Sequence, residues 1–142
     1  MRAGHSSSPG SWAGVLLNTD TASYAPSLTA VIASLAANTA TGKGSDTFVG
    51  VENLLGSSKV DSLTGSNTYN RLTGGGANDA LKGGAGNDTV IGSGGADTLA
   101  GEDGNDAVNS RDGTNGNDSL DGGSGTGTKV TDTTERSITG FP

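Results

Sequence analysis

The sequence predicts an all-β fold, a parallel β-solenoid whose coils are built from nine-residue units. Residues 74–109 read as four consecutive units, GGGANDALK, GGAGNDTVI, GSGGADTLA and GEDGNDAVN. Each unit has an Asp at the sixth place and an aliphatic residue at the eighth, the periodicity of a parallel β-helix. These recurring residues are Asp79, Asp88, Asp97 and Asp106 at the sixth place, and Leu81, Val90, Leu99 and Val108 at the eighth.

The composition is compatible with a solenoid, and it limits the classes of ligand that the chain is expected to bind. The chain of 142 residues holds 26 Gly and only 30% hydrophobic residues, which fits either a disordered chain or a solenoid with a thin core. The strict spacing favours the solenoid. A formal net charge of −7 argues against nucleic acid and suits a cation, and the lack of Cys excludes thiolate sites. No apolar run approaches the ~18 residues of a membrane span.

The chain before the repeats divides into two parts. Residues 1–14 are polar and rich in Gly and Ser, so we expect a flexible N-terminus with Trp12 as a packing residue. Residues 15–42 are expected to form a β lead-in that caps the solenoid, with a short strand at residues 15–17.

Within the lead-in, residues 27–40 are compatible with a helix or with strands. One set of apolar residues has helical spacing, namely Leu28, Val31, Ile32 and Leu35. A second set alternates as a strand would, namely Val31, Ala33 and Leu35. We favour strands.

Residues 43–73 read as degenerate repeats. Asp46 and Phe48 stand at the Asp place and at an inward-pointing place of a first worn turn. Two further units, 56–64 and 65–73, keep an inward leucine but lose most of their glycines. Their sixth- and eighth-place residues are Asp61 and Leu63, then Asn70 and Leu72.

The regular repeats are expected over residues 74–121, with one break in register. Three extra residues, 110–112, follow the fourth unit, and the pattern resumes with Asp118 and Leu120 at the sixth and eighth places.

The C-terminal residues 122–142 are expected to form a degenerate last repeat and a polar tail. Gly127 stands where an Asp belongs, and Lys129 stands where the aliphatic residue belongs. The solenoid is therefore expected to end near residue 130.

The residue types suit a turn that lies close to an ion. Gly allows the positive φ that such a turn needs, and Asn at the fifth place is expected to occupy the left-handed region. The eighth residue points inward because side chains alternate along a strand. Two units make one coil, so turns eighteen residues apart stack and bring two carboxylates together, where Ca²⁺ would relieve their repulsion. The fifth-place residues are Asn78, Asn87, Asn105 and Asn117.

These repeats resemble the RTX family of hemolysin-type calcium-binding nonapeptides. The segments 20–24, 31–35 and 39–42 are similar to the lead-in of that family, and residues 50–55 are similar to the short turn that precedes its repeats. The resemblance implies a right-handed parallel β-roll that binds several Ca²⁺ ions. It also implies a chain that is disordered in the absence of calcium.

The resemblance further implies which residues hold the ions, through turn carbonyls and the sixth-place Asp of two stacked turns. A first site would use Gly75, Ala77 and Asp79 with Gly92, Gly94 and Asp97. A second would use Gly84, Gly86 and Asp88 with Gly101, Asp103 and Asp106. A third would join Ser93, Gly95 and Asp97 to Gly113, Asn115 and Asp118 across the three-residue insertion.

The expected function is calcium binding, in a calcium-dependent folding module of a secreted, extracellular bacterial protein. No H-E-x-x-H or G-x-S-x-G motif occurs, so we expect no enzyme activity and no catalytic residues. The alternatives are a structural or adhesive solenoid that associates end to end, and the C-terminal β-roll of an exported enzyme whose catalytic domain lies outside this chain. Ice binding is disfavoured because the third places carry no row of Thr.

Overall fold

The protein is an all-β solenoid, as the repeats predict. The structure, a computed structural model, describes residues 2–4, 11–13, 19–42, 44–110, 117–130 and 137–141. Strands, and no helices, form the regular structure of these residues. Accordingly, nothing in the described part of the chain is a helix able to span a membrane.

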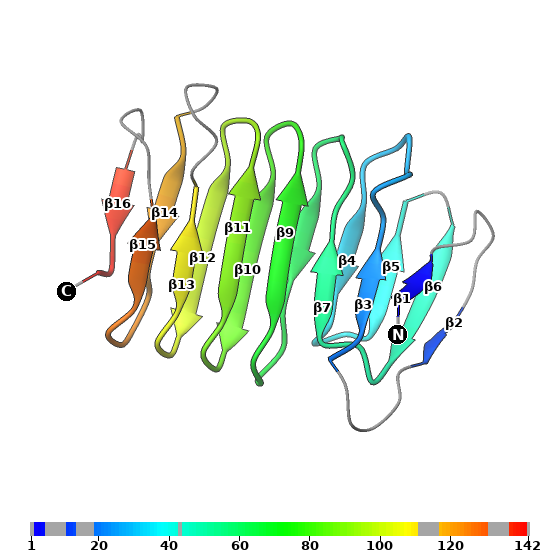
Figure 1. The fold of residues 1–142 in the computed structure, drawn as a ribbon, viewed down its shortest axis with the longest axis horizontal. Coiled ribbons are helices and arrows are strands. Elements are labelled where there is room, and N and C mark those ends of the chain that lie inside the picture. The colour runs from blue at the N-terminus through cyan, green and yellow to red at the C-terminus, as the bar shows by residue number, and fades with distance from the viewer. Residues whose placement is uncertain are drawn as a thin grey trace.

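The strands lie in two sheets, and the chain passes from one to the other as it winds (Figure 1). The first sheet has the order β1 (Arg2–Gly4), β3 (Thr21–Ser23), β7 (Asn53–Leu55), β9 (Arg71–Gly75), β11 (Thr89–Ser93), β13 (Ala107–Asn109) and β15 (Thr128–Val130). The second has the order β16 (Ser137–Thr139), β14 (Ser119–Asp121), β12 (Thr98–Asp103), β10 (Ala80–Ala85), β8 (Ser62–Thr64), β4 (Ile32–Ser34), β5 (Thr39–Thr41), β6 (Ser45–Val49) and β2 (Ser11–Ala13).

Parallel pairing keeps the eighth-place residues of successive coils opposite each other. Leu81 lies opposite Leu63 on one side and Leu99 on the other, and Val90 lies opposite Leu72 and Val108. The coil therefore repeats every two nonapeptides, as expected.

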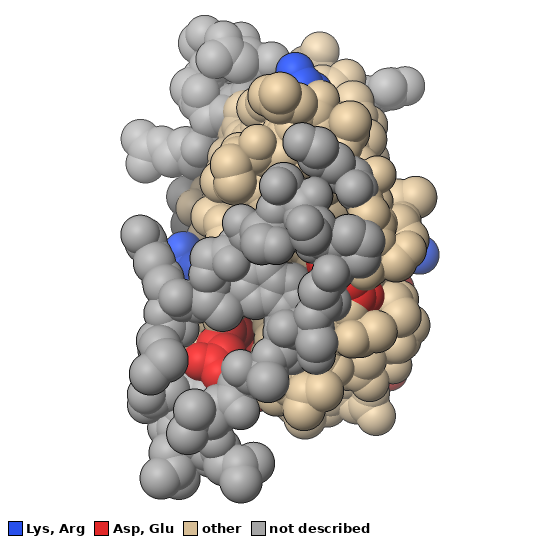
Figure 2. Space-filling view, turned by 90° about the vertical axis from the view of Figure 1, so that its right-hand side faces the viewer, with Lys and Arg blue, Asp and Glu red and all other residues tan. Residues whose placement is uncertain are grey.

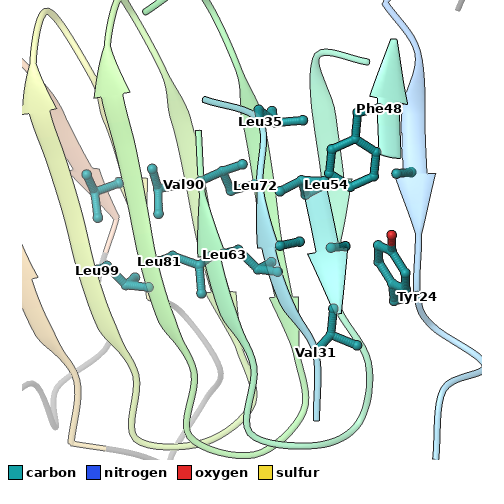
Figure 3. Packing of buried hydrophobic residues seen from close by; sticks show 14 of the residues in the cluster. Tyr24, Val31, Leu35, Phe48, Leu54, Leu63, Leu72, Leu81, Val90 and Leu99 are labelled. Atoms are coloured by element: carbon teal, nitrogen blue, oxygen red, sulfur yellow. The ribbon is translucent and has the colours of Figure 1, made fainter. Parts of the chain in front are cut away.

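The core is a double row of aliphatic side chains between the two sheets (Figure 3). Each aliphatic eighth-place residue is almost fully buried, while its neighbours in the strand are half-buried or exposed. Burial of one such side chain contributes about 1.5–3 kcal/mol. The rows consist of Leu54, Leu63, Leu72, Leu81, Val90, Leu99, Val108 and Leu120.

The lead-in forms strands, which confirms the favoured interpretation. Val31, Ala33 and Leu35 are buried, whereas Ile32 between them is 64% exposed. Here β4, β5 and β6 pair in antiparallel fashion, while β4 also pairs in parallel with β8. Asp46 and Phe48 are buried as expected, and the Tyr24 hydroxyl donates a 3.0 Å hydrogen bond to Asp46.

The N-terminal segment differs from the flexible stretch expected over residues 1–14. Within it, β1 pairs with β3, and β2 pairs with β6. The cause is the unpaired backbone of an edge strand, which pairs with any available extended segment. The expected strand at 15–17 and the side chain of Trp12 lie outside the described part of the molecule.

The C-terminal segment also differs from the expected polar tail. Lys129 in β15 lies opposite Val108 in β13. Strand β16 pairs with β14, and its Ile138 lies opposite Leu120. Phe141 packs against the core, and the Lys129 ammonium lies over its ring, 5.9 Å from the ring centroid. The three-residue insertion lengthens one coil without breaking the ladder, because Leu120 still lies opposite Leu99.

Candidate metal centre

The sixth-place residues stack into two columns of hydrogen bonds. In the first, the N–H of Asp61 donates to Oδ1 of Asp79 at 2.8 Å, Asp79 donates to Asp97 at 2.8 Å, and Asp97 donates to Asp118 at 2.7 Å. In the second, Asn70 donates to Asp88 and Asp88 donates to Asp106, each at 2.8 Å. One oxygen of each accepting carboxylate therefore joins neighbouring coils.

The other carboxylate oxygen has a different environment. Oδ2 of Asp79, Asp88 and Asp106 is buried and accepts no hydrogen bond from the described residues. These three residues are at most 2% exposed. A buried carboxylate oxygen without a donor is costly, so these atoms require a proton or a cation.

The pKa values of the same carboxyl groups reflect this cost. The pKa of Asp79 is raised to about 7, mainly by burial and also by the charges of Asp97 and Asp61, against the lowering effect of the hydrogen bond from the Asp61 backbone. Burial likewise raises the pKa of Asp88 to about 6 and raises that of Asp106. Like charges stacked in a buried column disfavour ionisation unless a positive charge compensates them.

Few acidic side chains show at one end of the roll. At the end of the roll that carries β2 and β6, the described surface is mostly neither acidic nor basic, and acidic atoms show only in small areas (Figure 2). Along the repeats, acidic side chains do reach the surface, as Glu102 and Asp103 show.

Backbone carbonyls face the same space as the orphaned oxygens. A β-carbon added to Gly83 would lie 2.6 Å from Asp88 Oδ2 and 2.6 Å from the carbonyl oxygen of Gly101 in the next coil. At Gly101, an added β-carbon would meet Asp106 Oδ2 and the carbonyl of Gly122. Glycine at the first place thus leaves room where oxygen acceptors converge, which is what a hard cation such as Ca²⁺ requires.

The donor set limits the kind of ion. No group of three or more His, Cys, Asp or Glu side chains among the described residues is placed to hold one metal ion. An ion held between two stacked turns would therefore have two carboxylates and would complete its shell with backbone carbonyls, as Ca²⁺ sites allow. The residues present fit calcium.

The turn backbone has the expected positive φ at the second and fourth places. Three non-glycine residues share it, at φ 71° for Ala77, 78° for Ser93 and 73° for Glu102. A left-handed conformation costs such residues roughly 1–2 kcal/mol each. The glycines with positive φ at these places are Gly75, Gly84, Gly86, Gly95, Gly104, Gly123 and Gly125.

The role expected for the fifth-place Asn is wrong. None of the fifth-place Asn residues in the described part has positive φ. Instead, Oδ1 of Asn78 accepts a 2.9 Å hydrogen bond from the N–H of Ala96, and Oδ1 of Asn87 accepts one of 2.9 Å from Asn105. The side chain links neighbouring coils, a contact that the sequence pattern alone does not reveal.

The structure brings together the residues of the first two expected sites. In the first, the N–H of Gly94 donates to the carbonyl of Gly75 at 3.0 Å, beside the stacked Asp79 and Asp97. In the second, the N–H of Gly86 donates to the carbonyl of Asp103 at 2.8 Å. Of the third, Asp97 and Asp118 are hydrogen-bonded, whereas Gly113 and Asn115 lie outside the described residues.

Two residues that the sequence patterns do not single out, Ser57 and Ser66, contact the sixth-place side chains. Both stand at the second place of degenerate turns, and both donate hydrogen bonds to the sixth-place side chain of their own turn. The available signal was the absence of glycine at the second and fourth places of these two turns.

Comparison with known proteins agrees with this geometry. A family model described as the RTX calcium-binding nonapeptide repeat matches the chain in four copies, at residues 55–90, 73–108, 82–115 and 112–126. Together these matches span residues 55–126, just over half of the 142 residues. No curated protein matches the chain at a significant level.

Proposed function

Because the chain belongs to the RTX calcium-binding nonapeptide repeat family, whose repeats bind several Ca²⁺ ions, we propose that calcium is an integral part of its folded state. The observation that carries the proposal is the set of buried Oδ2 atoms at Asp79, Asp88 and Asp106, which have no hydrogen-bond donor among the described residues. A bound Ca²⁺ ion supplies positive charge to these carboxylates and accepts the neighbouring carbonyl oxygens as ligands.

We assign the ions to stacked pairs of turns. The first pair provides the carbonyls of Gly75 and Ala77 with Asp79, and the carbonyls of Gly92 and Gly94 with Asp97. The second provides Gly84, Gly86 and Asp88 with Gly101, Asp103 and Asp106. Support comes from the stacking of the Asp residues of each pair and from the convergence of their oxygens on the first-place glycine.

A third ion is proposed between the turn that contains Ser93, Gly95 and Asp97 and the turn that contains Gly113, Asn115 and Asp118. The hydrogen bond from the Asp97 N–H to Asp118 supports it, since it has the same form as in the first two pairs. The inserted residues 110–112 place the two Asp residues of this pair 21 rather than 18 residues apart in the sequence.

The thin core explains why an ion would control folding. Each nonapeptide buries a single aliphatic side chain, and the same unit places a carboxylate in a buried column. Each added repeat therefore brings both the favourable burial of an aliphatic side chain and the unfavourable burial of a carboxylate to the free energy of folding. We infer that the column is stable as ionised carboxylates only with calcium, which makes the chain a calcium-dependent folding and stabilising module.

The setting proposed for this module is extracellular, in a protein secreted by bacteria. Extracellular calcium modules bind with dissociation constants of about 10⁻⁴–10⁻³ M, a range that favours folding outside the cell. We propose a non-enzymatic role, and the β-roll of an exported enzyme remains the alternative. Activity assays on the longest native product that contains this chain would distinguish them.

End-to-end self-association is a second proposal. The terminal strands of the described sheets, β1 and β15 in one and β16 and β2 in the other, each have one paired neighbour. Unpaired strand edges favour pairing with another chain, and calcium lowers the net charge that keeps copies apart. Phe141 and β16 cover part of the C-terminal end and oppose association. Sedimentation in calcium and in chelator tests it, and a strict monomer at high concentration would exclude it.

The principal test is a calcium titration followed by circular dichroism. We expect little β signal in chelator and a cooperative gain near millimolar calcium. Magnesium is the control, since it demands a tighter octahedron and retains its waters. A β spectrum that is the same in chelator and in calcium would contradict the proposed function.

A further inference from the structure

The degenerate turn at residues 56–61 closes on its own Asp. Ser57 donates its N–H to Asp61 Oδ2 at 2.5 Å and its hydroxyl to Asp61 Oδ1 at 3.0 Å. The N–H of Val31 also donates to Oδ1, at 2.8 Å. Both oxygens of this carboxylate therefore accept hydrogen bonds, unlike the carboxylates of Asp79, Asp88 and Asp106.

The next degenerate turn, residues 65–70, closes in the same way around a neutral side chain. Ser66 donates its N–H at 2.6 Å and its hydroxyl at 3.0 Å to Oδ1 of Asn70. The amide nitrogen of Asn70 donates to the carbonyl of Glu52 at 2.8 Å. The polar atoms of Asn70 are thus satisfied by the chain itself.

The serine hydroxyl also fixes the backbone of each closed turn. The N–H of Lys59, at the fourth place, donates to Ser57 Oγ at 3.0 Å, and the N–H of Thr68 donates to Ser66 Oγ at 3.4 Å. None of these four residues has positive φ. The closed turns therefore have a different backbone from the regular ones, in which the second and fourth places are left-handed.

Glycine content separates the two kinds of turn. Each regular turn over residues 74–106 has glycine at the second place, the fourth place or both, and a single glycine suffices in the turn with Ser93 and Gly95 and in the turn with Glu102 and Gly104. The closed turns have glycine at neither place, with Ser57 and Lys59 in one and Ser66 and Thr68 in the other. Serine at the second place is thus compatible with both forms, and the fourth place decides between them.

We propose that the closed turns at residues 56–61 and 65–70 take no calcium, because serine donors occupy the sixth-place oxygens on which an ion would have to bind. This rests on the proposed calcium function and specifies which repeats perform it. Ser57 and Ser66 supply the donors, and the fourth-place residues Lys59 and Thr68 determine specificity, because a turn with serine at the second place closes only when the fourth place lacks glycine. The family match at residues 55–90 includes both turns, so family membership alone does not make this distinction.

A hydrogen-bond donor and a cation compete for the same carboxylate oxygen. At the regular turns the first-place carbonyl of the next coil and the carboxylate oxygen meet without a donor between them. At the turn 56–61 the carbonyl of Gly74 and Asp61 Oδ2 approach Gly56 in the same way, but the Ser57 N–H already points to Oδ2. A cation there would have to displace that N–H and would be repelled by it. Calcium binding thus begins at the coil that starts with Gly74.

The decisive variant is Lys59→Gly, which changes the turn from GSSKVD to GSSGVD and so matches the regular turn GSGGAD at residues 92–97 in its second and fourth places. We expect it to bind one more calcium ion per chain than the wild type at saturation, measured by equilibrium dialysis. Ser57→Gly/Lys59→Gly should show the same gain. Lys59→Gln removes the charge without adding glycine, and Ser58→Gly adds glycine at the third place; both controls should bind as many ions as the wild type.

A measurement on the unmodified protein guards against a variant that fails to fold. In saturating calcium, where the chain is folded, the amide of Ser57 should be strongly protected from hydrogen exchange because it donates to Asp61. Fast exchange of that amide in saturating calcium, or an unchanged number of ions in the folded Lys59→Gly variant, would overturn the inference. A wild type that binds no calcium at all would instead contradict the proposed function.

Discussion

The backbone N–H of Asp79 donates a 2.8 Å hydrogen bond to Oδ1 of Asp97 in the next coil. The same bond recurs between Asp88 and Asp106 in the other column. The Asp106 side chain thus has two tasks, because one oxygen joins the coils while the other faces the carbonyl of Gly122 in the next coil. Loss of an Asp should therefore affect stacking and ion binding together, and loss of its charge alone should affect mainly ion binding.

Asp97→Ala should raise the calcium midpoint of folding more than Asp118→Ala. Asp97 accepts a hydrogen bond from Asp79 and donates one to Asp118, so it serves two pairs of turns, whereas Asp118 follows the inserted residues. The midpoints are read from circular dichroism titrations. Asp97→Asn is the matched control, which retains an acceptor oxygen and should lose calcium affinity with less damage to the stack. Equal shifts for the two alanine variants would argue against shared, stacked sites.

Calcium should bind more weakly as the pH falls below about 7. The pKa of Asp79 is raised to about 7 and that of Asp88 to about 6, so protons compete with calcium in this range. In the absence of calcium the sign reverses. A raised carboxyl pKa stabilises the folded form at low pH, fully below the unfolded value of 3.8, and this stabilisation is lost as the pH rises through 6 to 7.

The measurement is a calcium titration at several pH values between about 5 and 8. Free calcium is read with an electrode, since chelators themselves release protons. The midpoint should fall with rising pH and level off above the pKa of Asp79. A midpoint independent of pH would show that these carboxylates are not ligands.

Ala77→Gly should stabilise the calcium-bound fold by about 0.5–1 kcal/mol, because relief of the left-handed strain exceeds the entropy cost of glycine. Ala77 has φ 71°. Ala80→Gly, three residues later in β10 and without positive φ, should instead destabilise by about 0.5–1 kcal/mol. Urea unfolding in saturating calcium measures both. The same sign for the two variants would contradict the strain argument.

Leu81→Ala should lower the free energy of unfolding by about 2–5 kcal/mol, since a cavity replaces a side chain packed in the row of eighth-place residues. Leu81 is only 1% exposed. Leu28→Ala is the control, since Leu28 is 78% exposed and should change stability by no more than about 0.5 kcal/mol. Comparable losses at the two positions would show that the row does not form the core.

The periodic part of the fold could be predicted from the sequence because each place of the nonapeptide has one dominant physical requirement. The inward leucine, the stacked Asp and the glycine turn each recur, so one error in interpretation would be exposed by the next repeat. The lead-in strands followed from the alternation of Val31, Ala33 and Leu35 around exposed Ile32.

The other features depend on contacts that leave no local pattern. Strands β1, β2 and β16 exist because edges of the sheets are available to pair with, and no alternation within three residues signals this. The residue type of Asn78 suggests a role in the backbone conformation of the turn, whereas its side chain forms a hydrogen bond that links two coils. In the sequence, Ser57 marks only the loss of a glycine, yet its N–H and hydroxyl donate hydrogen bonds to both carboxylate oxygens of Asp61.

The pairing of Leu81 with Leu63 and Leu99 has a consequence for how a gene for this protein can change in length. Duplication of a segment that encodes two nonapeptides would add one strand to each sheet and leave every later residue on its original side. Duplication of a single nonapeptide would transfer all later strands to the opposite sheet, so that β16 and Phe141 would meet the wrong edge. The three-residue insertion at 110–112 is compatible with the ladder, because Leu120 still lies opposite Leu99. Recombination should therefore change the number of repeats in pairs, and short insertions should gather between strands.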